Sequence, residues 1–113
     1  MTDIYTGYGW GKTYVGMCGS GDIYTGYGWG KTFVGEYTVD GDVYKGYGWG
    51  RTYVGCFKDG AVYSGYGWGK SVVGEYKNGS IYKGYGWGRE HIGEYKGEDG
   101  GAAAAALLLL FDK

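Results

Sequence analysis

The five residues GYGWG occur five times in this chain of 113 residues. The copies stand at 7–11, 26–30, 46–50, 65–69 and 84–88, so successive copies are 19, 20, 19 and 19 residues apart. Self-similarity at a fixed short period is typical of repeat architectures, in which each unit packs on its neighbours. The repeat therefore restricts the possible folds before any single residue is considered.

Each repeat divides into two halves that share the frame G-x-x-Y-x-G, as in GDVYKGYGW followed by GRTYVGCFKD over 41–59. Nine or ten residues suit one short strand and a tight turn, whereas a helix and its connection need more. Ile, Val, Tyr, Trp, Phe and Thr favour strands, and the SGD, DGD, DG and NG segments favour turns. We therefore predict an all-β fold: an antiparallel meander or ribbon of about ten short strands, from five hairpin repeats over 1–97.

Strict alternation predicts how GYGWG is used if the strand continues through it. In a strand over 23–29, Tyr24, Gly26 and Gly28 would share one face, and Trp29 would lie on the other. Aromatic rings could then pack on glycine along one face while a Tyr–Trp ladder followed the other. The candidate binding residues of this ladder are Tyr8, Trp10, Tyr27, Trp29, Tyr47, Trp49, Tyr66, Trp68, Tyr85 and Trp87.

The charge balance and the hydropathy pattern exclude several classes. Eleven Lys and Arg against twelve Asp and Glu give a net charge of −1, so we expect no nucleic-acid partner. The apolar run 102–111 has ten residues, about half of what a membrane span needs. No basic segment followed by an apolar one opens the chain, so we expect no signal peptide and favour a cytoplasmic location.

The two cysteines, Cys18 and Cys56, are not at equivalent positions of their repeats. Cys18 follows its glycine by two residues and Cys56 by one, so the two side chains should face opposite sides of the sheet. If each repeat is a hairpin, they are four strands apart, about 19 Å, against a limit of ~7 Å for a disulfide. We predict two free thiols.

The C-terminal segment 98–113 abandons the repeat and reads GEDGGAAAAALLLLFDK from 97 onward. Ala and Leu are strong helix formers, so we predict a helix of two to three turns after a Gly-Gly hinge. Five Ala followed by four Leu is not an amphipathic pattern. We therefore expect the helix to be buried, either capping the last hairpin or packing on a neighbouring subunit.

Segments such as VVGEYKNGSIYKGYG (72–86) and YVGCFKDGAVYSGYG (53–67) resemble the MORN repeat over nearly all of 3–96. The units here have 19 or 20 residues, whereas MORN units usually have about 23. The resemblance implies a twisted antiparallel ribbon that scaffolds other proteins. The chain also resembles, more weakly, the choline-binding repeats of cell-wall proteins, which would imply ligand cages built from the Tyr and Trp side chains.

The residue directly after every GYGWG is basic: Lys12, Lys31, Arg51, Lys70 and Arg89. This row could bind an acidic partner, a lipid headgroup or a phosphate. Alternatively, the cations keep the sheet edge soluble, stack on a nearby Trp and pair with the repeated acidic residues Glu36, Glu75 and Glu94. The second interpretation is preferred.

We find no arrangement that predicts catalysis, a metal site or a cofactor. His91 is the only histidine, and no repeated carboxylate or cysteine accompanies it. Asp3, Asp22 and Asp42 recur at one position, where turn capping is the ordinary explanation. The chain lacks a nucleophile–base pair, a phosphate loop and paired carboxylates.

These observations predict a non-enzymatic structural module. It would self-assemble into a filament or oligomer, through unpaired edge strands, or scaffold another protein through its repeated Tyr/Trp surface. The alternative is a carbohydrate- or choline-binding module with aromatic cages between repeats.

Overall fold

The computed structural model describes residues 1–26, 28–46, 48–65 and 67–111. Ten strands follow one another through these residues, two in each repeat, and an α-helix and a π-helix follow the last strand. The strands are β1 Thr2–Thr6, β2 Thr13–Gly19, β3 Asp22–Thr25, β4 Thr32–Tyr37, β5 Asp42–Lys45, β6 Thr52–Lys58, β7 Ala61–Ser64, β8 Ser71–Lys77, β9 Ser80–Lys83 and β10 Glu90–Lys96. The predicted all-β class, strand number and C-terminal helix are confirmed.

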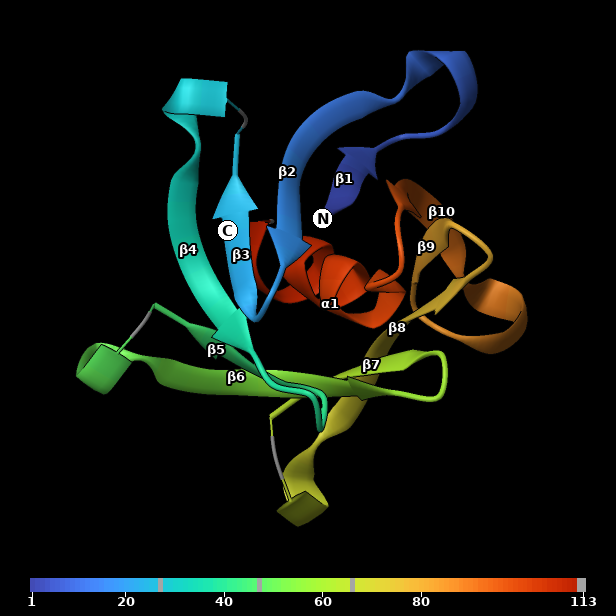
Figure 1. Ribbon diagram of the computed structural model, residues 1–113. Helices are drawn as coiled ribbons and strands as arrows, with labels where there is room; N and C mark the ends of the chain where they lie inside the picture. The colour runs from blue at the N-terminus through green and yellow to red at the C-terminus, as the bar shows by residue number, and fades with distance from the viewer. Residues whose placement is uncertain (27, 47, 66, 112–113) are drawn as a thin grey trace.

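The sheet closes on itself, because β1 pairs with β10 as well as with β2. The register of the closing pair runs from Asp3 opposite Lys96 to Thr6 opposite Gly93. Figure 1 shows the resulting barrel, with its five hairpins radiating outward around the helix α1. The expectation of unpaired edge strands is therefore wrong, since closure pairs the first strand with the last.

The predicted turns are present at one end of the barrel, which we call the turn end. Ser20–Gly21, Asp59–Gly60 and Asn78–Gly79 have positive φ at both residues, as a type I′ hairpin turn requires. The extra residue of the second repeat lies in the longer turn between β4 and β5, where Val39 is fully exposed.

The prediction that GYGWG continues a strand is wrong. β3 ends at Thr25, and Gly28–Gly30 forms a 3₁₀ turn before β4 begins. Gly26 and Gly28 have φ of +77° and +58°, which a strand cannot contain. Each GYGWG segment therefore belongs to the loop between the two strands of its repeat, and these loops define the other end of the barrel, the loop end.

Alternation does hold within the strands, and it divides the barrel into an inside and an outside. The inner wall of the odd strands carries one fully buried β-branched residue per repeat: Ile4, Ile23, Val43, Val62 and Ile81. Opposite each of them, an even strand supplies a buried glycine, as in the pair Ile4 and Gly16. A β-bulge follows each of these pairs, and bulges bend and twist a sheet, as closure requires.

The C-terminal segment fills the barrel. It forms α1 (Gly100–Ala105) and continues as the π-helix Ala106–Phe111; together, 100–111 are called the inner helix. The five alanines 102–106 are wholly buried, in one cluster with the five β-branched residues of the inner wall. Burial of the tail is confirmed, but inside its own barrel. The predicted hinge is wrong, because Gly100 and Gly101 belong to the helix.

The five large residues of the inner helix each meet one inner glycine. A Cβ atom on Gly93 would lie 2.7 Å from a methyl carbon of Leu107, and one on Gly55 would lie 2.9 Å from Leu109. The complete set of pairs is Leu107 with Gly93, Leu108 with Gly74, Leu109 with Gly55, Leu110 with Gly35 and Phe111 with Gly16. Each step along the helix therefore moves one repeat around the barrel.

This pairing accounts for the π-helix. Five repeats around a full circle require a rotation of about 72° per residue, whereas an α-helix turns by about 100°. A π-helix, with its i to i+5 hydrogen bonds, is wound more widely and comes closer to that rotation. The wider winding coincides with the segment that packs on the glycines, Ala106–Phe111.

The segment that follows β10 enters the barrel at the turn end. Four of the five repeats place an aromatic ring inside, and these rings follow one another at centroid distances of 6.4–6.5 Å: Tyr37, Phe57, Tyr76 and Tyr95. The remaining repeat, the first, has Cys18 there, with its sulfur 3.9 Å from the Asp99 carbonyl oxygen. The smaller side chain leaves space where the segment from β10 enters.

Polar contacts fix this entering segment. The backbone N–H of Asp99 donates to Thr2 Oγ1 at 2.9 Å, and the Tyr37 hydroxyl donates to Asp99 Oδ2 at 3.0 Å. Gly100 and Gly101 lie so close to Tyr95 and Phe57 that side chains there would overlap the rings. These contacts fix the path of the chain from β10 to the inner helix.

Both cysteines are free, as predicted, and lie on opposite faces of the wall. Cys18 is buried inside, and burial raises the pKa of its thiol to about 12. Cys56 is half-buried on the outside. No described helix has the length and apolar character that crossing a membrane requires.

The glycine contacts predict the effect of adding one methyl group. We expect Gly74→Ala to lower the free energy of unfolding by about 1–3 kcal/mol, because its Cβ would overlap the Tyr82 carbonyl oxygen and Leu108. Gly69→Ala in the same repeat is the matched control, since a Cβ there meets nothing within 4 Å. Urea unfolding followed by circular dichroism measures both, and equal stabilities would contradict the packing described here.

Candidate interaction surface

The five tryptophans are the most exposed large side chains of the described chain. Each stands at the centre of a 3₁₀ turn, and each is fully exposed, with a relative exposure of 106%: Trp10, Trp29, Trp49, Trp68 and Trp87. They lie in the loops that connect the paired strands of each radiating hairpin (Figure 1). The molecule measures 39 × 39 × 24 Å, so the tryptophans are displayed around a flattened body.

The predicted Tyr–Trp ladder is not formed, because the tryptophans lie in turns. Tyr8 and Tyr85 of the GYGWG segments are also exposed. The Tyr8 ring stacks on His91 with a centroid distance of 4.5 Å and an interplanar angle of 10°. Tyr27, Tyr47 and Tyr66 lie outside the described residues.

The basic row does stack on aromatic rings, but on Tyr rather than Trp. Arg51 lies 3.9 Å from the ring centroid of Tyr44, and Lys12 lies 4.5 Å from that of Tyr5. The remaining pairs are Lys31 on Tyr24, Lys70 on Tyr63 and Arg89 on Tyr82. Every outward Tyr of the odd strands therefore has one face covered by a cation from its own repeat.

Three of these cations also bind a carboxylate of the neighbouring repeat, as the sequence suggested. Arg51 donates to Glu36 at 2.6 Å, Arg89 to Glu75 at 2.5 Å, and Lys12 to Glu94 at 3.1 Å. The last pair joins the first repeat to the fifth. The positions facing Lys31 and Lys70 hold Met17 and Cys56, which explains why these two cations have no corresponding carboxylate.

Two aspartates have a role that the sequence did not reveal. Asp3 accepts a hydrogen bond from the hydroxyl of Tyr14, and Asp42 from that of Tyr53, both at 3.4 Å. Burial, reinforced by Asp3, raises the pKa of Tyr14 to about 12. Burial, together with Cys56 and Asp42, raises that of Tyr53 to about 12. In both cases the Asp and the Tyr lie on neighbouring strands of one repeat. The only sign of these contacts in the sequence was the repeated spacing between the Asp and the Tyr.

An open hollow lies beside one tryptophan, and it combines aromatic and charged groups. It is lined by Trp49 and Gly48 of the loop, by the stacked pair Arg51 and Tyr44, and by Glu36 and Tyr53. A flat ring beside donor and acceptor groups can hold a ligand by stacking and hydrogen bonds. Among the residues described, no three His, Cys, Asp or Glu side chains gather as a metal site would require.

Comparison with known proteins adds no relative. No protein-family model matches the chain, and neither the curated proteins nor the solved structures yielded a match. The resemblances to MORN and choline-binding repeats therefore stay predictions.

The ion pair that joins the first and last repeats predicts a pH effect. The hydrogen bond from Lys12 lowers the pKa of Glu94 below its ordinary value. This pair therefore stabilises the fold above the unfolded-state pKa, and that contribution is lost as the pH falls through the folded-state pKa. In a carbon-13 NMR titration, we expect Lys12→Met to raise the pKa of Glu94 toward the ordinary value.

Lys31→Met is the matched control, because Lys31 faces Met17 instead of a carboxylate. It should leave the titration of Glu94 unchanged. If Glu94 titrates at the same pH in the wild type and in Lys12→Met, the ion pair between Lys12 and Glu94 does not form in solution.

Proposed function

We propose that this chain is a non-enzymatic structural scaffold whose five Trp-bearing loops are contact sites through which copies associate. The observation that carries the proposal is the complete exposure of all five tryptophans. A monomeric protein has no folding reason to place a large apolar ring in solvent five times, and Trp is enriched at the energetic centres of protein interfaces.

The number of loops matters for the energetics. Burying one Trp ring removes roughly 200 Å² from water, about 5 kcal/mol at 25 cal/mol per Å². Association itself costs an estimated 4–15 kcal/mol, so a single loop is too weak to hold two copies together. Several loops engaged at once gain from high effective concentration, which a rigid barrel with five equivalent loops favours.

The mode of association differs from the edge-strand filament that the sequence suggested. Within the residues that the structure describes, every strand is paired on both sides, so the contact is made by side chains of the loops. The lack of a nucleophile–base pair or paired carboxylates in the sequence supports a role without catalysis.

The hollow beside Trp49 favours a second candidate, a carbohydrate-binding module. A sugar ring could lie on Trp49 while its hydroxyls bonded Glu36 and Arg51. The choline version of this idea has less support. In this hollow, Arg51 of the protein already covers one face of Tyr44, and a bound ammonium group would have to compete with it.

Sedimentation velocity over a wide concentration range tests the proposal. We expect the wild-type sedimentation coefficient to rise with concentration, and a variant with Ser at all five Trp positions to remain monomeric. Val39→Ser removes a fully exposed apolar side chain at the opposite end of the barrel, so it should associate like the wild type. Each variant must first show a wild-type circular dichroism spectrum.

A wild-type protein that stays monomeric up to about millimolar concentration would overturn self-association. So would a five-fold Trp variant that still associates. Quenching of Trp fluorescence by soluble oligosaccharides in such a monomer would then support the carbohydrate-binding candidate.

A further inference from the structure

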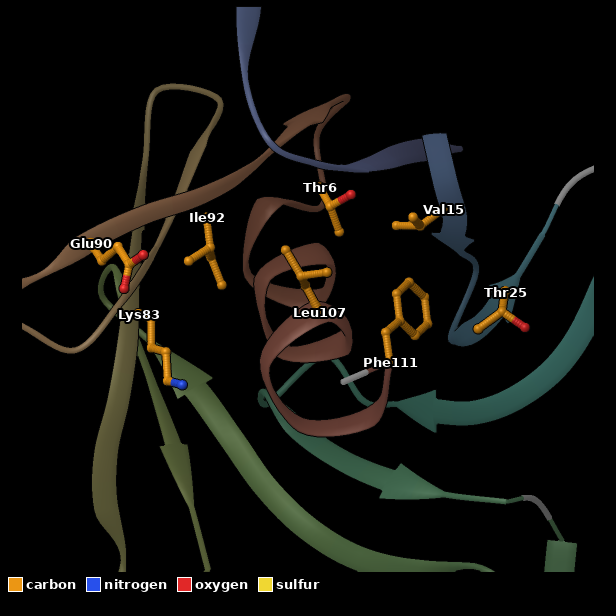
Figure 2. Close-up of a pocket in the computed structure, with 8 residues that line it drawn as sticks. All are labelled: Thr6, Val15, Thr25, Lys83, Glu90, Ile92, Leu107 and Phe111. Carbon is orange, nitrogen blue, oxygen red and sulfur yellow. The ribbon is translucent and has the colours of Figure 1, made fainter. Parts of the chain in front are cut away.

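A cavity of about 440 Å³ lies at the loop end of the barrel, beside the last turn of the inner helix. Four apolar side chains form its floor: Val15, Ile92, Leu107 and Phe111. Figure 2 shows these side chains gathered around the end of the helix, with Lys83 and Glu90 together on one side and Thr25 on the other. The volume falls within the range of small-molecule sites, which often occupy barrel mouths.

The rim of the barrel mouth is formed by the residues at which each odd strand ends and each even strand begins. In most repeats these residues are Thr or Ser, as at Thr25, Ser64 and Thr52. The fifth repeat has Lys83 and Glu90 there instead, and the two are register partners on β9 and β10. The third repeat also has a lysine at the first position, Lys45, but only the fifth repeat combines a lysine with an acidic residue, and both of these line the cavity.

The rim residues define the chemistry of a matching ligand. Lys83 can only donate hydrogen bonds, an ionised Glu90 can only accept them, and the hydroxyls of Thr6 and Thr25 can do both. An anionic group would meet the Glu90 carboxylate, and a cationic group would meet the Lys83 ammonium. A neutral hydroxyl can accept from Lys83 and donate to Glu90, so it satisfies both.

We propose that this cavity binds a small neutral amphipathic alcohol. Its apolar body packs on Val15, Ile92, Leu107 and Phe111, and its hydroxyl group lies between Lys83 and Glu90. The site is inside the barrel mouth, whereas the tryptophans of the proposed function lie outside. Either idea can therefore fail without the other.

The test uses the full chain with 1-hexanol as the probe, followed by carbon-13 methyl NMR. We expect saturable shifts of the Val15, Ile92 and Leu107 methyl signals, and much smaller shifts for Leu109, which packs on Gly55 and does not line the cavity. Hexanoate and hexylammonium, matched in length, should bind more weakly than hexanol.

Two variants restore the residues of other repeats and so should fold normally. Lys83→Ser copies Ser64, and Glu90→Thr copies Thr52. Each should weaken hexanol binding about three- to tenfold through the loss of one hydrogen bond. Lys45→Ser is the matched control, because Lys45 is the equivalent of Lys83 in the third repeat and does not line the cavity.

Three results would overturn the proposal. Shifts that do not saturate, or that spread over the Trp loops, would mean that hexanol has no site in the cavity. Tighter binding of hexanoate or hexylammonium would mean that the ligand class is wrong. Equal affinities in Lys83→Ser, Glu90→Thr and Lys45→Ser would mean that the charged pair does not recognise the hydroxyl group.

Discussion

Five glycines on the inner wall and five large side chains of the inner helix pack against each other one to one, from Leu107 on Gly93 to Phe111 on Gly16. A ten-stranded barrel is too wide for its own side chains to fill, least of all with glycine at every second strand. The helix supplies the missing volume. Full burial of a Leu side chain contributes about 1.5–3 kcal/mol, which Leu107 approaches, while Leu108, Leu109 and Leu110 are half-buried. The match between helix rotation and repeat number lets every repeat take part.

The inner helix packs on the inner wall and leaves a cavity at the loop end, so contacts with other copies involve the outer surface. The outward tyrosines hold the cations that follow the loops, as with Arg51 on Tyr44, and neighbouring repeats are joined by pairs such as Arg51 with Glu36. The exposed tryptophans lie beyond this layer. A rigid body with repeated apolar loops is suited to multivalent association, which is the basis of the function proposed for it.

Local chemistry in the sequence predicted much of this fold. The Gly-containing turns, the strand number and the separation of Cys18 from Cys56 all follow from residue types and spacing. Closure did not follow, because it depends on bulges and register, which the local pattern leaves open. The strand prediction failed at GYGWG since aromatic residues favour strands, while the positive φ at Gly26 and Gly28 ends them. The order of the tail, five Ala followed by four Leu and Phe111, is explained only by the barrel, in which each large residue packs on the glycine of one repeat.

The most direct test of the central claim is a nuclear Overhauser experiment on the full chain, with methyl-labelled Leu and labelled Gly. The account predicts that the Leu107, Leu108, Leu109 and Leu110 methyls contact the Hα atoms of Gly93, Gly74, Gly55 and Gly35, in that order. Contacts in any other order, or between the Leu methyls and only one side of the barrel, would contradict it.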